Sequence, residues 1–259
     1  MIKILICNDD GYEAAGLRQL AKGLADEYEV YVCAPASQKS AFSHSITYFR
    51  GEHKAYPVEI EGARKAWALE GTPADCAYFG IYGFFKEEGI DLVISGINQG
   101  DNVASDIIYS GTVGAAMEGL ISGVPSIAMS LCDFESDDFS VAVKACKKVI
   151  PYYMNLAEKK EFVLNVNVPP LKEEEIKGFK VCIQEGIKIY PNDVDIVKKD
   201  GYYSISSEQH ANPEAPENTF RNGDHTAVRN GYITLTPLSF YLQDTKNFDK
   251  IRDLETFSL

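Results

Sequence analysis

The chain opens with IKILICNDDG, residues 2–11, and this stretch is the strongest indication of its fold. The first six residues are short, apolar and rich in Ile, as in a strand buried inside a sheet. Two adjacent carboxylates, Asp9 and Asp10, follow directly. They repel each other, and charging a strand end that meets a core is costly. A divalent cation removes both problems, and oxygen ligands of this kind favour Mg²⁺, Mn²⁺ or Ca²⁺ over Zn²⁺. The alternative is that one of the two acids only caps the next helix.

Strand and helix patterns alternate from this stretch through the first two thirds of the chain. We expect strands over 2–7, 29–34, 91–95, 125–130 and 162–167, and helices over 13–25, 112–122 and 138–157. A further helix opens at Thr72, as N-cap, and Pro73, and residues 44–69 are expected to hold two or three short strands. This alternation predicts an α/β fold, with a parallel sheet covered by helices on both faces.

The pattern changes at about residue 171, so we expect 1–170 to be the catalytic core. Residues 171–259 then complete the core and form a smaller arm, with short strands, a polar loop at 207–224, a strand at 232–236 and an amphipathic segment at 244–257. Without βα alternation, this part is not expected to extend the parallel sheet. Its apolar residues would lie on an appendage too small to bury them, which predicts a homodimer or homotetramer with exchanged arms. These residues are Tyr232, Ile233, Leu235, Leu238, Phe248, Ile251, Leu254 and Phe257.

Composition excludes several classes of protein. The 259 residues are 45% hydrophobic and 24% charged, as in a globular protein. A net charge of -13 argues against nucleic-acid binding. The six cysteines form no CxxC pair and are expected to be reduced, in a cytoplasmic protein. No apolar stretch has the length of a signal peptide or a membrane span, so no membrane partner is expected.

Three loops are expected beyond the carboxyl ends of the strands, where open parallel sheets bind ligands. The longest is 96–112, and a loop of this length is usually functional. In it we assign Asn98, Gly100 and Asn102 to phosphate or substrate binding, although asparagines are also common turn formers. Ser110, Gly111 and Thr112 begin a helix, and a glycine-rich helix start suits an anion. The alternative for this helix start is a plain N-cap with close packing.

The loop at 35–45 contains four serines around His44. A serine hydroxyl can complete the oxygen shell of a hard cation, but a loop serine is more often a solvated turn residue. His44 is a candidate general acid or base, and also a candidate surface residue, because no glutamate or second histidine is evidently paired with it. The chain has no G-x-S-x-G, P-loop or G-x-G-x-x-G motif, which disfavours serine hydrolases and dinucleotide enzymes.

Together these segments resemble the SurE family of 5'-nucleotidases over nearly the whole chain. The matching motifs are ILICNDDG (4–11), AP-x4-S (34–40), S-x-SIT (43–47), GTPADC (71–76), SGINQGDN (95–102), D-x-x-YSGTVGAAMEG (106–119) and D-x-x-A-x-x-x-GYITLTPL (224–238). The resemblance implies a three-layer α/β/α, Rossmann-like core, one divalent metal per subunit and subunits that exchange C-terminal arms. It also implies four metal ligands, namely Asp9, Asp10, Ser40 and Asn98. The chain departs from the family pattern at Gln99 and Asp101, beside the phosphate loop.

The sequence therefore predicts a phosphomonoesterase that uses Mg²⁺ or Mn²⁺ to hydrolyse nucleoside 5'- or 3'-monophosphates. Asp9 and Asp10 are the catalytic candidates. One carboxylate is expected either to serve as general base for a water molecule or, in the case of Asp9, to attack phosphorus itself. Two alternatives remain open, a nucleotide-binding regulatory module without turnover and a metal-dependent glycosyltransferase.

Overall fold

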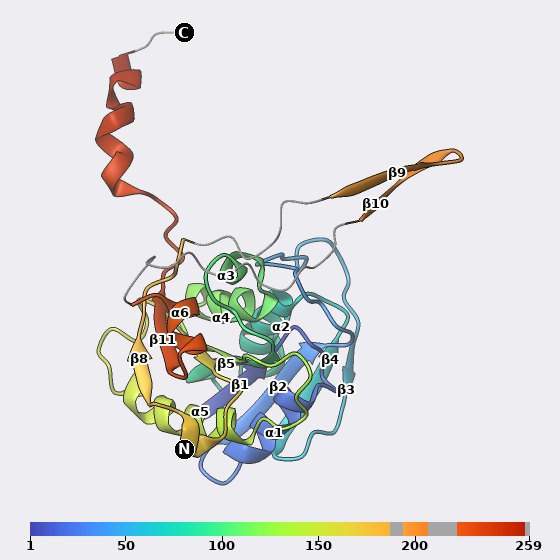
Figure 1. Cartoon of the computed structure of the whole chain (residues 1–259). Coiled ribbons are helices and arrows are strands. Elements are labelled where there is room, and N and C mark those ends of the chain that lie inside the picture. Colours follow the sequence, from blue (N-terminus) through green and yellow to red (C-terminus); the bar gives the residue numbers. More distant parts are fainter. Residues whose placement is uncertain (187–193, 207–221, 257–259) are drawn as a thin grey trace.

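A nine-stranded sheet forms the centre of the protein, in the order β3-β4-β2-β1-β5-β6-β7-β11-β8 (Figure 1). The computed structural model describes residues 1–186, 194–206 and 222–256. The strands from β4 to β7 in this order run parallel, whereas β3 and β11 are antiparallel to β4 and β7, and β8 is parallel to β11. The strands span Lys3–Cys7 (β1), Glu29–Pro35 (β2), Ala55–Pro57 (β3), Ala63–Leu69 (β4), Leu92–Gln99 (β5), Ser126–Leu131 (β6), Val163–Val168 (β7), Phe179–Val181 (β8) and Ile233–Leu238 (β11).

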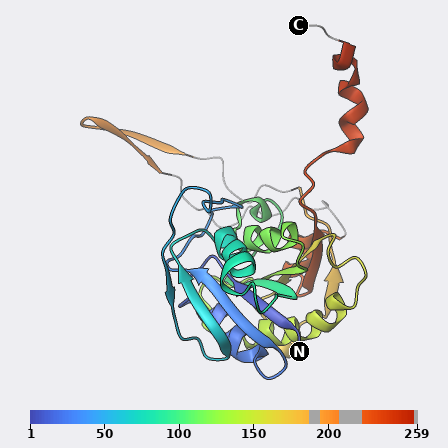
Figure 2. The ribbon, with the colours of Figure 1, turned by 180° about the vertical axis from the view of Figure 1, so that it is seen from behind.

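Helices cover both faces of this sheet, so the protein has three layers (Figures 1 and 2). α1 (Ala15–Leu24) and α5 (Ser140–Met154) pack on one face, and α2 (Pro73–Phe79) and α4 (Gly111–Ile121) on the other. Shorter helical segments are η1 (Gly80–Phe84), α3 (Asp106–Tyr109), η2 (Glu173–Glu175) and α6 (Asp224–Arg229). The predicted α/β fold with a mostly parallel sheet is confirmed.

β1 shows why an unbroken apolar run forms a central strand. Side chains alternate between the faces of a sheet, so Ile4 and Ile6 pack in the cluster that contains α1 and α5. Leu5 and Cys7 join the opposite cluster, with α2 and α4. All four are fully buried, and burying one large aliphatic side chain stabilises a fold by about 1.5–3 kcal/mol.

The region after residue 171 does extend the sheet, contrary to the expectation from the sequence. β11 pairs antiparallel with β7, with Leu235 opposite Val166. Ile233 and Leu238 are 5% and 7% exposed and belong to core clusters of the chain itself. The expectation was wrong because βα alternation is required only between parallel neighbours, whereas an antiparallel strand can join an edge without a crossover helix.

Two segments stand clear of this body (Figures 1 and 2). One is the hairpin of β9 (Asp195–Lys199) and β10 (Tyr202–Ser206), and the other is the 3-10 helix η3 (Thr245–Thr256). Five apolar or aromatic side chains of the hairpin are between 50% and 68% exposed, namely Ile196, Val197, Tyr202, Tyr203 and Ile205. Residues 207–221 of the expected polar loop and Phe257 lie outside the described residues, as do the side chains of Phe248, Ile251 and Leu254.

The cysteines are free thiols, and all except Cys132 are buried. Burial raises the pKa of Cys146 to about 12, so that thiol stays protonated and unreactive at neutral pH. Among the described helices, none is both long enough and apolar enough to span a membrane.

Candidate active site

The predicted site residues gather at the carboxyl edge of the sheet because β1 lies between β2 and β5. Asp9 and Asp10 follow β1, the loop that contains Ser40 follows β2, and Asn98 is near the end of β5. Two backbone contacts join these segments. The Lys39 N–H donates to the Asp9 carbonyl at 2.7 Å, and the Gln99 N–H donates to Asp10 Oδ2 at 3.3 Å.

A tight turn at residues 8–11 presents the two carboxylates. The Asn8 side chain is fully buried and bonds Gly11 in both directions, from Nδ2 to the carbonyl at 2.8 Å and from the Gly11 N–H to Oδ1 at 3.2 Å. Gly11 has a φ of 101°, a left-handed conformation that favours glycine. In this NDDG segment, Asn8 and Gly11 therefore shape the turn, and the two acids between them are left to face the site.

Asp9 and Asn98 place oxygen atoms around one hydroxyl group. Thr112 Oγ1 donates to Asp9 Oδ1 and lies 3.4 Å from Asn98 Oδ1. Asp9 is 4% exposed, whereas Asp10 is only partly buried. The structure thus brings together three of the predicted residues, Asp9, Asn98 and Thr112, with Asp10 beside them.

The electrostatics of the two acids fit a cation. Burial raises the pKa of Asp9, against the lowering effect of the Thr112 hydroxyl and nearby backbone N–H groups. Burial and the charge of Asp9 raise the pKa of Asp10 to about 6. Both carboxylates are therefore costly to charge in the folded chain, chiefly because burial removes them from water. Among the described residues no three His, Cys, Asp or Glu side chains cluster as metal ligands, so a cation here would bind two carboxylates, amide or hydroxyl oxygens, and water.

Ser40 lies near these acids without contacting them. Its side chain is exposed, and its hydroxyl accepts a hydrogen bond from Gln38 Nε2 at 3.0 Å. The preceding residue, Lys39, is the one that bonds the backbone of Asp9. The metal-ligand assignment of Ser40 stays a prediction.

The start of α4 faces the carboxylates. Ser110 is the N-cap, and its hydroxyl accepts from the Val113 N–H at 3.1 Å. Gly111 lies directly on Asp9, since a Cβ added at Gly111 would lie 2.9 Å from Asp9 Oδ2. The positive end of a helix favours anions, so this close approach aims it at Asp9 and at whatever binds beside it.

Gly100 and Asn102 shape the long loop. The Gly100 carbonyl accepts from Asn98 Nδ2 at 2.8 Å, which orients the Asn98 oxygen towards Thr112. Asn102 is 5% exposed and donates from Nδ2 to Ser130 Oγ at 2.8 Å, while its backbone bonds the amides of Asn165 and Asn167. Asn102 therefore fastens the loop to β6 and β7, and its role in substrate binding stays a prediction.

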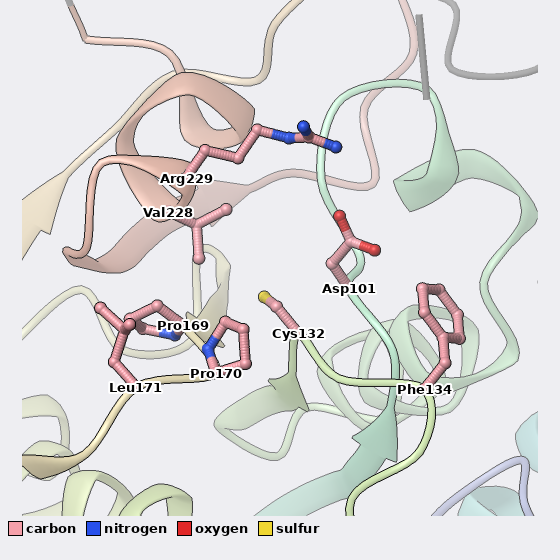
Figure 3. A pocket seen from close by; sticks show the side chains of 8 residues that line it. All are labelled: Asp101, Cys132, Phe134, Pro169, Pro170, Leu171, Val228 and Arg229. Atoms are coloured by element: carbon pink, nitrogen blue, oxygen red, sulfur yellow. The ribbon is translucent and has the colours of Figure 1, made fainter. Parts of the chain in front are cut away.

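Gln99 and Asp101, the two departures from the family pattern, have side chains with other surroundings. Gln99 Nε2 donates to the Ser136 carbonyl at 3.1 Å. Asp101 lines a cavity of about 500 Å³ together with Cys132, Phe134 and Arg229 (Figure 3). In the part of the chain that the structure describes, neither side chain has a hydrogen bond or ion pair with Asp9 or Asp10.

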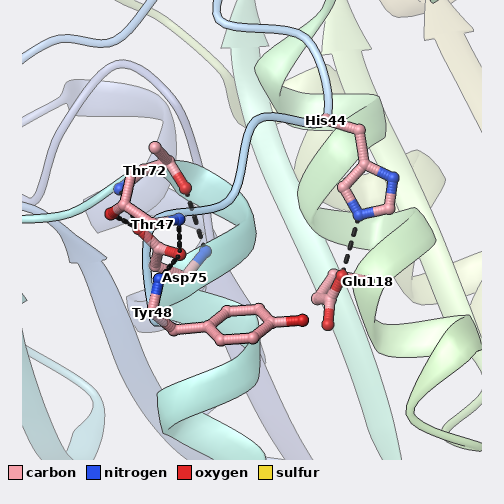
Figure 4. A network of polar contacts seen from close by, with 6 residues as sticks. All are labelled: His44, Thr47, Tyr48, Thr72, Asp75 and Glu118. Carbon is pink, nitrogen blue, oxygen red and sulfur yellow. Dashed lines mark hydrogen bonds and ion pairs between the residues drawn. The ribbon is translucent and has the colours of Figure 1, made fainter. Parts of the chain in front are cut away.

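Sequence reasoning missed the partner of His44. His44 Nε2 donates to Glu118 Oε2 at 2.8 Å (Figure 4). Glu118 is 5% exposed and comes from α4. The available signal was a single acid among the small and apolar residues of GTVGAAMEGLI, because a carboxylate on a buried helix face requires a partner.

A second missed cluster surrounds Asp75, at the start of α2 (Figure 4). One carboxylate oxygen accepts from the N–H groups of Thr47 and Tyr48 at 2.7 and 3.0 Å, and the other accepts from the Thr72 N–H at 2.9 Å. Thr72 caps the helix in return, accepting from the Asp75 N–H at 3.1 Å. Asp75 is thus a structural acid that fixes the chain after His44.

Comparisons with known proteins agree with this geometry. The family model described as "Survival protein SurE" matches residues 4–189. A 5'-nucleotidase SurE from Clostridium beijerinckii is 41% identical over 264 residues, covering 96% of this chain and 100% of its own, and one from Clostridium botulinum (strain Eklund 17B / Type B) is 40% identical over 257 residues, covering 98% and 99%. The crystal structure of a SurE protein from Aquifex aeolicus superposes with a TM-score of 0.82 at 36% identity, over 98% of this chain and 99% of that one. The chain belongs to the SurE family.

Proposed function

We propose that the protein is a metal-dependent 5'-nucleotidase that hydrolyses nucleoside monophosphates to a nucleoside and phosphate. The observation that carries the proposal is the convergence of Asp9, Asp10 and the Asn98 amide oxygen at the start of α4. The curated relatives named 5'-nucleotidase SurE support the same reaction. Nucleoside 3'-monophosphates are the second proposed substrate class, and their rate of phosphate release is to be compared with that of the 5'-monophosphates.

One divalent cation per subunit, Mg²⁺ or Mn²⁺, fits the oxygen atoms of this site. Asp9, Asp10 and Asn98 would hold it, with Ser40 from the neighbouring loop. The raised pKa of both acids supports this, because burial makes their negative charge costly and a bound cation would offset that cost. When bound, the cation polarises the phosphoryl group and makes a water molecule more acidic.

The chain's own residues supply orientation and proton transfer. The N-terminus of α4 stabilises the charge of the substrate phosphate. Asp9 is enclosed by Thr112 and Gly111, so we assign the general-base role to Asp10, which is more accessible. Asp10 takes a proton from the attacking water as the water oxygen bonds to phosphorus. The bond between phosphorus and the nucleoside oxygen breaks, and that oxygen leaves as a hydroxyl with a proton taken up from solvent water.

A neighbouring cavity has room for the nucleoside. It has a volume of about 860 Å³ and lies against Ser110, the N-cap of α4, and Gly114 within that helix. Its lining includes the aromatic side chains of Phe42 and Tyr241. An apolar, aromatic cavity beside a phosphate site suits a base and a sugar.

Phosphate release from AMP tests the proposal. EDTA is expected to abolish turnover, and Mn²⁺ or Mg²⁺ to restore it. Asp10→Asn should lower kcat by about a hundredfold or more, the usual contribution of a general base, whereas Glu61→Gln at an exposed ion pair should leave it unchanged. Full activity in exhaustively metal-free protein contradicts the proposal. Binding of AMP without phosphate release would instead indicate a regulatory module, and activity restricted to nucleotide-sugars a glycosyltransferase.

A homodimer, or a tetramer built from dimers, completes the proposal. The exposed apolar side chains of β9 and β10 support it, because an isolated two-stranded hairpin is marginally stable in water. A second copy of the chain is a partner that covers this surface by symmetry.

A further inference from the structure

The segment that carries Ser40, residues 36–48, is fastened to the body at both of its ends. At its start, the Ala36 N–H donates to the Leu69 carbonyl at 2.8 Å and the Lys39 N–H to the Asp9 carbonyl at 2.7 Å. At its end, Thr47 and Tyr48 donate to Asp75 (Figure 4). We name this segment the Ser40 loop.

The middle of the Ser40 loop is held by α3 and α4. The Ser43 N–H donates to the Tyr109 carbonyl, and Ser43 Oγ to the Ile108 carbonyl, both at 2.9 Å. A Cβ added at Gly114 would lie 2.6 Å from the Ser43 carbonyl oxygen, so only glycine allows the loop to lie so close to α4. These contacts place Ser43 and His44 directly on the helix whose first residues face Asp9.

The backbone between Ser40 and His44 is unfavourable without such support. Ala41 and Ser43 have φ values of 60° and 53°, a left-handed conformation that residues other than glycine rarely adopt. Such conformations persist where surrounding contacts hold them. The side chain at the end of this stretch, His44, makes the 2.8 Å contact with Glu118.

The contact between His44 and Glu118 joins the Ser40 loop to α4. Glu118 is 5% exposed and lies within α4, and the phenol of Tyr48 also points towards it (Figure 4). A buried carboxylate strongly favours an imidazole N–H as its partner, because an unpaired charge there is costly. His44 is therefore held to one place, four residues along the chain from Ser40.

We propose that His44 is a positioning residue, which through Glu118 holds the Ser40 loop on α4 and so fixes the place of Ser40 beside the proposed cation site. The inference rests on the proposed function, in which these oxygens bind the cation. His44 is not itself proposed as a cation ligand, and because it lines the cavity proposed for the nucleoside, its effect on the cation is measured without substrate. Its contribution is to the affinity for the cation and not to the chemical step.

Mn²⁺ binding to the full-length, metal-free protein, followed by the electron paramagnetic resonance signal of free Mn²⁺ without substrate, measures this role. His44→Ala is expected to weaken the Mn²⁺ Kd about tenfold, the lower end of the effect of residues that support metal ligands. His44→Gln, which keeps an N–H donor for Glu118, should recover most of the affinity. At saturating Mn²⁺ the kcat for AMP should stay within about twofold of wild type, because the groups that act on phosphate are intact.

A double-mutant cycle tests the connection to Ser40. Ser40→Ala should weaken Mn²⁺ binding, and His44→Ala added to it should produce no further loss, since both changes remove the same hydroxyl from the cation. Lys147→Ala is the matched control: Lys147 lies on the distant α5 and its ion pair with Glu27 is removed, so Mn²⁺ binding should be unchanged. Glu118→Gln changes the other partner of the His44 contact and is also expected to weaken Mn²⁺ binding. This second variant keeps the test valid if His44→Ala does not fold.

The possible outcomes separate the two proposals. A wild-type Mn²⁺ Kd in folded His44→Ala and in Glu118→Gln overturns the positioning role and leaves the proposed function standing. Additive losses in Ser40→Ala/His44→Ala overturn it too, because they would show independent effects. Failure of the wild-type protein to bind Mn²⁺ or to release phosphate from AMP overturns the proposed function and this inference with it.

Discussion

The carboxyl edge of the sheet and the β9–β10 hairpin differ in the origin of their contacts. Around Asp9, each loop is fastened by hydrogen bonds within the chain, from Asn8 to Gly11, from Lys39 to Asp9 and from Asn102 to Ser130. The hairpin has its own ladder of paired strands but exposes its apolar side chains. A site that must hold oxygen atoms at fixed places needs support from its own core, whereas exposed apolar side chains such as those of the hairpin fit the partner surface proposed above.

Gly111→Val is expected to give the largest effect on the fastened region. Its Cβ would lie 2.8 Å from the Asp9 Cβ and 3.0 Å from Pro73 Cγ, so the carboxylate must move. We expect kcat/KM for AMP to fall about a hundredfold, through displacement of a catalytic group, with a loss of stability of about 1–3 kcal/mol from overpacking. Steady-state kinetics and urea unfolding measure the two effects. Wild-type kinetics in Gly111→Val would show that the segment at Gly111 only caps the helix and does not bind phosphate.

Asn98→Ala and Asn102→Ala separate a ligand from a loop fastener. Asn98→Ala removes an oxygen beside Asp9 and is expected to raise the Mn²⁺ concentration for half-maximal activity about tenfold. Asn102→Ala removes one buried hydrogen bond and should cost about 1–2 kcal/mol of stability, with an unchanged Mn²⁺ requirement. An unchanged Mn²⁺ requirement in Asn98→Ala would remove Asn98 from the ligand set.

Asp75→Asn tests a purely structural acid next to the site. Burial acts to raise the pKa of Asp75, but the hydrogen bonds from Thr47 and Thr72 outweigh it and lower the pKa from 3.8. A carboxyl whose pKa is lower in the folded state stabilises the fold above the unfolded pKa, and this stabilisation is lost as pH falls through the folded value. We expect Asp75→Asn to lower the free energy of unfolding by about 1 kcal/mol at pH 7. The difference in this free energy between variant and wild type should shrink as the pH falls. Urea unfolding of both proteins at pH 7 and pH 3 measures this difference. A difference in stability that is larger at pH 3 than at pH 7 would contradict the prediction.

Changes in the hairpin should have the smallest effect on chemistry. Ile196→Ser with Ile205→Ser is expected to shift the protein towards the monomer, since exposed apolar surface is what a partner buries. Activity per chain at low concentration should stay within about twofold of wild type, because the residues around Asp9 keep their contacts. Light scattering across a wide concentration range reports assembly. A full-length protein that is monomeric throughout would refute the exchanged-arm proposal and leave the site intact.

Much of the fold was predictable because its signals are local. The helix opening at Thr72 and Pro73 forms as predicted, with Thr72 capping the Asp75 N–H. The predicted strand over 91–95 runs on to Gln99, which carries Asn98 into the sheet. Polar residues and a glycine there resemble a loop, but pairing of Asn98 with Ser130 of β6 continues the strand. The joining of β11 to β7 was missed for the same reason, since a pairing between distant segments leaves no local pattern.

The amino-acid sequence by itself determined which residues turn, cap and alternate, because those preferences depend on a residue and its near neighbours. It sufficed to place Asp9 and Asp10 at a strand end and Gly111 at a helix start. Only the tertiary structure decided that Thr112 lies between Asp9 and Asn98, and that His44 meets Glu118 74 residues away. Those contacts arise from the packing of α4 against the central strands, and packing selects partners by position in space, which no spacing along the chain records.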